Sequence, residues 1–102
     1  MPKGYIVAHI RIFDDQAYAR YTEMVQGPMA AYDGSPLARG GRAETPEGRP
    51  FPRNVVMEFP SYEAALQYYH SPEYQLAKAV RETAAEAHVV VVEGVDPPVA
   101  TS

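Results

Sequence analysis

The stretch from Val55 to Gln75 constrains the fold more than any other part of this chain. Its first residues alternate in the way that is typical of a strand, and Pro60 ends that strand because proline cannot donate a ladder hydrogen bond. Ser61 then has the features of a helix cap, and Ser71-Pro72-Glu73 repeats them further along. The stretch therefore predicts a strand followed by a helical pair with a break at His70.

Length and composition limit the class of protein. The 102 residues suit one domain over residues 1–95, followed by a disordered tail over residues 96–102. A net charge of -4 and the absence of a lysine-rich tract argue against nucleic acid as a partner. No apolar run approaches the roughly 20 residues of a membrane span, which argues against a membrane partner. Because the first residues lack the apolar core of a signal peptide, we expect a cytoplasmic protein.

Three further strands and one further helical segment complete the predicted elements. Residues 5–13 form a strand in which every even position is apolar, whereas the odd positions mix apolar and polar side chains. A helix follows the Asp14-Asp15 cap, and Gly27-Pro28 predicts that it kinks or divides into two short helices. A strand over 37–44 contains adjacent glycines, which indicate a bulge or a close approach of another chain or ligand. The last predicted strand covers residues 87–95.

This order of elements predicts an α+β fold. With right-handed crossovers, it gives the ferredoxin-like βαββαβ arrangement, an antiparallel four-stranded sheet with helices on one face only. The odd positions of the first strand are too apolar for a surface left open to water. We therefore expect the bare sheet faces of two copies to pack together as a homodimer.

Several short motifs together resemble a known family. They are Lys3-Gly4-Tyr5, Leu37-Ala38-Arg39-Gly40-Gly41, Val56-Met57-Glu58-Phe59-Pro60-Ser61 and Ser71-Pro72-Glu73-Tyr74-Gln75. In combination they are similar to the domain-of-unknown-function family 1330, within the dimeric α+β barrel superfamily, over roughly residues 3–95. The resemblance implies a homodimer built through its sheets and no settled activity. Relatives in the superfamily include cofactor-independent monooxygenases, muconolactone-isomerase-like enzymes and haem-binding members, so the fold alone is a weak guide to chemistry.

His9 and Glu58 are the candidate catalytic residues. Imidazole titrates near neutrality, so His9 is the natural general acid or base on the mixed face of the first strand. The alternative is a hydrogen-bonded residue of a dimer interface. Glu58 either orients His9 or pairs with one of the arginines Arg11, Arg39 and Arg42, because a carboxylate in this apolar strand needs a partner.

Arg39, Tyr69 and His70 are the candidate ligand-binding residues. The planar fork of Arg39 suits a carboxylate or enolate oxygen, although a structural salt bridge explains it equally well. Tyr69 and His70 lie at the predicted helix break, where they would form the rim of a pocket between helix and sheet. The alternative for His70 is an exposed residue that the helix dipole stabilises.

Neither a metal nor an organic cofactor is predicted. The set formed by His9, Glu58 and His88 lacks the short spacing of a metal site, and the chain has no cysteine. The leading hypothesis is a small homodimeric enzyme that binds and converts a small anionic or aromatic molecule, as an isomerase or a cofactor-independent monooxygenase would. The alternative is a non-catalytic dimer that binds a small molecule or has a purely structural role.

Overall fold

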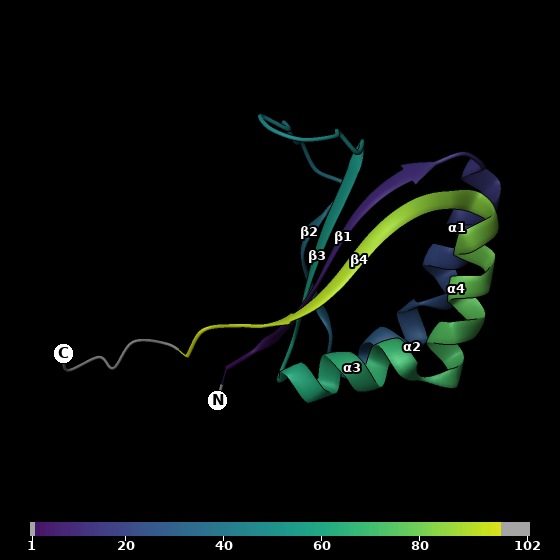
Figure 1. Ribbon diagram of the computed structural model, residues 1–102. Helices are drawn as coiled ribbons and strands as arrows, with labels where there is room; N and C mark the ends of the chain where they lie inside the picture. Colours follow the sequence, from purple (N-terminus) through teal and green to yellow (C-terminus); the bar gives the residue numbers. More distant parts are fainter. Residues whose placement is uncertain (1, 97–102) are drawn as a thin grey trace.

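The computed structural model describes residues 2–96, which form one twisted sheet with helices against a single face (Figure 1). The elements of this range are β1 (Gly4–Ile12), α1 (Asp15–Met24), α2 (Gln26–Ala31), β2 (Ser35–Arg39), β3 (Arg53–Phe59), α3 (Tyr62–His70), α4 (Pro72–Ala84) and β4 (Ala85–Glu93). The strand order is β2-β3-β1-β4, and all neighbouring strands are antiparallel. The predicted ferredoxin-like α+β fold is confirmed. The predicted disordered tail lies, apart from Asp96, outside the described residues.

Serine side chains set the limits of α3 and α4 as the sequence predicts. The Ser61 hydroxyl accepts a hydrogen bond from the Ala64 amide at 3.0 Å and so caps α3. Ser71 has two roles, because its hydroxyl donates to the Tyr68 carbonyl at 2.8 Å and accepts from the Tyr74 amide at 3.1 Å. One buried side chain therefore ends α3 and begins α4, which fixes the angle between the two helices.

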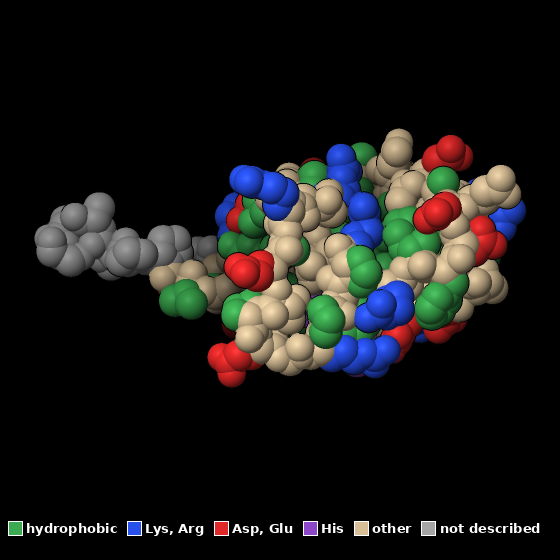
Figure 2. Space-filling model, turned by 90° about the horizontal axis from the view of Figure 1, so that it is seen from above, with side chains coloured by type: hydrophobic (Ala, Val, Ile, Leu, Met, Phe, Trp, Pro, Cys, Tyr) green, Lys and Arg blue, Asp and Glu red, His purple; other side chains and the backbone are tan. Residues whose placement is uncertain are grey.

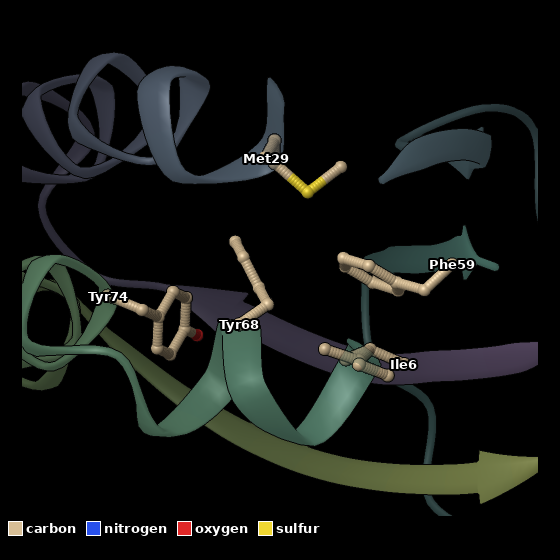
Figure 3. Close-up of a cluster of buried hydrophobic side chains, with 6 residues drawn as sticks. Ile6, Met29, Phe59, Tyr68 and Tyr74 are labelled. Atoms are coloured by element: carbon tan, nitrogen blue, oxygen red, sulfur yellow. The ribbon is translucent and has the colours of Figure 1, made fainter. Parts of the chain in front are cut away.

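The helix-facing side of the sheet forms the core. Ile6, Ala8 and Ile10 of β1 are buried, whereas the alternate residues of the same strand are half-buried or exposed. Figure 3 shows Met29 of α2 across this core from Ile6, with the ring of Phe59 between them in this view. The predicted assignment of even positions to the helix face is confirmed.

The first helical segment divides into two short helices, which is one of the two predicted outcomes. Val25 separates α1 from α2, and Pro28 lies in the first turn of α2. A proline at that position cannot donate to the carbonyl of Met24, so a continuous helix would lack a hydrogen bond there. Among residues 2–96 no helix combines the length and the apolar character that crossing a bilayer would require.

The second strand differs most from the prediction. It covers Ser35–Arg39 and not residues 37–44, because Gly40 has a φ of 71° and turns the chain away from the sheet. The irregular register lies between Pro36 and Ala38, ahead of the glycines in the chain. Gly40 lies against the side chain of Arg53, whereas Gly41 has open space around it, and neither glycine is the bulge itself. The last strand begins two residues earlier than predicted, directly at the end of α4.

Candidate functional site

A cavity of ≈ 570 Å³ separates α1 and α2 from the sheet. It exists because α1 packs mainly against α4 and not against the strands. Three arginines, four tyrosines and many apolar side chains line it, and none of the lining residues is a carboxylate or a histidine. Its polar lining is Tyr18, Tyr21, Thr22, Gln26, Arg39, Arg53, Tyr68, Tyr74 and Arg81.

Arg81 is the most unusual residue of the cavity. Its side chain belongs to α4 and is only 5% exposed. Its Nε atom is buried without a hydrogen-bond partner, and no carboxylate of residues 2–96 forms an ion pair with it. A buried charge without a counter-charge costs several kcal/mol, so such a group normally meets an anion. The geometry thus provides a cation that the protein itself does not neutralise.

The phenols of Tyr21 and Tyr68, beside Arg81, stay protonated. The hydroxyls of Tyr21 and Tyr74 are 3.0 Å apart, and the Arg81 guanidinium lies over the Tyr21 ring at 5.8 Å from its centroid. Burial raises the pKa of Tyr21 and that of Tyr68 well above the ordinary value of tyrosine. Neither phenol therefore balances the charge of Arg81. Both can instead donate a hydrogen bond to an anionic oxygen.

Arg53 and Gly40 form a second polar feature of the same cavity. The Nε atom of Arg53 is also buried without a partner, and its guanidinium lies over the Tyr18 ring at 5.5 Å. A Cβ atom added at Gly40 would collide with the Nη1 atom of Arg53. Gly40 is thus favoured by its positive φ, and a Cβ there would also make the end of the Arg53 side chain move.

Arg39 lines the cavity from the end of β2, where it is exposed. Tyr69 and His70 line neither this cavity nor a second one on the opposite face of the sheet. Tyr69 packs on Tyr74 with ring centroids 5.1 Å apart, and so supports the cavity from behind. His70 is the exposed last residue of α3.

A second cavity, also of ≈ 570 Å³, lies on the opposite face of the sheet beneath the hairpin between β2 and β3. His9 and His88 are register partners on β1 and β4, and Phe51 lies over them with ring centroids 6.3 and 5.0 Å away. The Nδ1 atom of His9 is hydrogen-bonded to the Asn54 carboxamide oxygen at 2.7 Å. The two histidines therefore lie side by side beneath Phe51.

The predicted combination of His9, Glu58 and Arg39 does not form a single site. His9 faces away from the cavity that Arg39 lines, because successive residues of a strand point to opposite faces. Glu58 contacts neither His9 nor an arginine, since its carboxylate accepts a hydrogen bond from the Tyr5 hydroxyl at 3.1 Å. That bond raises the pKa of Tyr5. Of the three arginines expected as partners, Arg11 instead has its Nε atom 3.9 Å from the Glu86 carboxylate.

Arg53 and Arg81 are the site residues that the prediction did not include. Arg81 had a signal in the sequence, since it shares the buried stripe of α4 with Tyr74 and Ala77 at helical spacing. Arg53 had none, because its position beside Gly40 depends on where β2 ends. Figure 2, seen from the hairpin end, shows basic side chains, in blue, among hydrophobic ones in the middle of that face of the molecule.

The fold and the cavity define a small ferredoxin-like α+β protein with an internal cationic pocket. The chain belongs to a family described as a domain of unknown function (DUF1330), whose model matches residues 3–95. No curated protein matches the chain.

Solved structures support the fold. A protein of unknown function from Rhodopseudomonas palustris, RPA0582, is 17% identical with a TM-score of 0.74, covering 94% of this chain and 85% of its own. A dimeric ferredoxin-like protein of unknown function from Thermobifida fusca is 13% identical with a TM-score of 0.60, covering 90% and 91%. SnoaB, a cofactor-independent oxygenase from Streptomyces nogalater, is 9% identical with a TM-score of 0.56, covering 95% and 97%. At these identities the likeness concerns the fold alone.

Proposed function

We propose that the protein binds a small anionic molecule with an apolar or aromatic body in the cavity between helices and sheet. The observation that carries this proposal is the buried Arg81 guanidinium, which has no carboxylate partner among residues 2–96. An anionic oxygen at Arg81 would satisfy the guanidinium and accept a hydrogen bond from whichever of the Tyr21 and Tyr74 phenols does not donate to the other. The tyrosine rings and aliphatic residues would surround the body of the ligand.

The proposed assembly is a homodimer in which the open sheet faces pack together. Val90 and Val92 are 53% and 44% exposed on this face, and Val7 and Val56 are their half-buried neighbours in the register. Such a ridge favours burial against another protein surface. The Thermobifida fusca protein of similar fold is described as dimeric. A cytoplasmic location remains a proposal that rests on the sequence.

Conversion of the ligand is a second candidate function, and the composition of the pocket restricts its type. A protein-driven isomerisation needs a group that titrates near neutrality, whereas the residues lining this cavity include no carboxylate and no imidazole. Arginine and phenol donors suit a hydroquinone that forms its own oxyanion and reacts with dioxygen. The substrate would supply all four electrons, taking up one oxygen atom to become a hydroxyquinone while the other oxygen atom leaves as water. Oxygen uptake with 2,5-dihydroxybenzoate tests this function: uptake above the uncatalysed rate in the wild type, and not in Arg81→Met, would support it. Equal rates would contradict turnover with this probe.

The binding proposal predicts two opposite effects of Arg81→Met. Without ligand the variant should be more stable by about 1–3 kcal/mol, because an unneutralised buried charge is removed. This corresponds to roughly 4–8 °C in Tm per kcal/mol for a domain of this size. Phenylacetate should stabilise the wild type and not the variant, whereas its neutral methyl ester should stabilise neither.

Thermal unfolding with and without phenylacetate measures both effects. Arg20→Met is the matched control, because Arg20 lies exposed on α1 outside the cavity. This control should keep both the stability and the response to phenylacetate of the wild type. A less stable Arg81→Met that still responds to phenylacetate would contradict the proposed function.

A further inference from the structure

Arg53 and Arg81 line the same cavity, and the Nε atom of each is buried without a hydrogen-bond partner. The two residues belong to different elements. Arg81 comes from the last part of α4, and Arg53 is the first residue of β3. Each guanidinium lies over a tyrosine of α1, Arg53 over Tyr18 and Arg81 over Tyr21. The two rings are in contact, with centroids 5.3 Å apart. The two cations therefore belong to one continuous site.

The protein supplies no negative charge to this pair. The cavity lining includes no carboxylate, and both ion pairs of residues 2–96 lie on Glu86, which is not part of the lining. The raised pKa of Tyr21 keeps the phenol beside Arg81 neutral. Stacking on an aromatic ring stabilises a guanidinium but leaves its charge in place. Two like charges at the wall of an apolar cavity also repel each other, which makes anions there more favourable.

The backbone is shaped to place the second cation. Gly40 holds a φ of 71°, and its missing side chain leaves the space that the Arg53 guanidinium occupies. The Gly40 amide donates to the Asn54 carbonyl at 3.1 Å, which holds the turn against the start of β3. Gly41, its neighbour, has open space around it and no such contact. The position of Arg53 is thus built in by a specific turn.

From this charge balance we infer that the ligand of the cavity is a dianion, with Arg81 and Arg53 both neutralised by it. This inference rests on the proposed function and specifies the charge of the ligand. Two separated carboxylates or one doubly charged phosphate group would provide the same charge. In both cases the second negative charge acts through Arg53, while Arg81 suffices for a singly charged ligand.

Calorimetric titration with four probes at one ionic strength tests the inference. The probes are 1,4-phenylenediacetate, phenyl phosphate, phenylacetate and the neutral dimethyl ester of phenylenediacetate. The wild type should bind at least one dianion tenfold or more tightly than phenylacetate, and should not bind the ester. A preference for phenylenediacetate indicates two separated carboxylates, and a preference for phenyl phosphate indicates one phosphate group.

Arg53→Gln should reduce that preference to twofold or less and change phenylacetate binding less than threefold. Arg20→Gln is the control and should keep the full preference. If Arg53→Gln does not fold, Arg53→Lys takes its place and should retain part of the preference for the dianion. Phenylacetate binding that equals dianion binding in the wild type and is lost in Arg81→Met would overturn the dianion and leave the proposed function intact. Absence of binding by all three anions would overturn both.

Discussion

The two faces of the sheet are built from alternate residues of the same strands, yet their polar groups differ in one respect. On the open face, hydrogen bonds join polar side chains in pairs, Tyr5 with Glu58 and His9 with Asn54. On the helix face, Arg53 and Arg81 have buried atoms without partners. Paired polar groups beside exposed valines are typical of a protein surface that meets another, whereas unpaired cations in a cavity indicate a ligand.

The largest expected effect concerns the open face. Val90→Asp places a carboxylate in the middle of the valine ridge, where the proposed dimer would bury it without a counter-charge. Such a burial costs about 3 kcal/mol or more, so the dimer should weaken by roughly a hundredfold or more. Native mass spectrometry combined with sedimentation at several concentrations measures the change.

Leu76→Asp is the control for this substitution. Leu76 is 66% exposed but lies on α4, outside the open face of the sheet. Leu76→Asp should leave the assembly unchanged. If both variants weaken the dimer equally, the sheet faces are not the interface, and if neither does, the open face has another role.

The second effect concerns the turn that places Arg53 on the helix face. Gly40→Ala introduces a Cβ at positive φ and against the Arg53 guanidinium, so it should destabilise the fold by about 1–3 kcal/mol. Gly41→Ala, where a Cβ meets open space, should be nearly neutral. Chemical unfolding of the two variants measures the difference. Equal losses would mean that the turn, and with it the position of Arg53, is not fixed by Gly40.

Local signals explain why most of the fold could be predicted from the sequence. The caps at Ser61 and Ser71 act within a few residues, and the alternation of β1 records which face is buried. The end of β2 was mispredicted because β propensity over residues 37–44 does not reveal the φ of Gly40. That angle is fixed by a tertiary contact with Arg53, which lies on another strand.

The site was harder to predict, because its mark is that the buried Nε atoms of Arg53 and Arg81 lack hydrogen-bond partners. A sequence does not show which buried groups stay unpaired. Arg39 was chosen for its chemistry, and the structure does place it at the cavity. Nothing in the sequence separates Arg81 from an exposed helical arginine such as Arg20 except its place on the buried stripe of α4. His9 drew attention through its pKa range, but strand alternation puts it on the face opposite the cavity.

The smallest expected effect therefore comes from His9→Ala. His9 is exposed, and the sheet separates it from the cationic pocket, so phenylacetate affinity should change less than twofold. The proposed dimer should weaken only slightly, because the lost bond of His9 is to Asn54 of the same protomer and not to the partner. Titration of phenylacetate into His9→Ala and Arg81→Met side by side measures the contrast. A loss of binding in His9→Ala as large as in Arg81→Met would show that the two faces act as one site, which is possible only if the partner protomer brings His9 to the cavity.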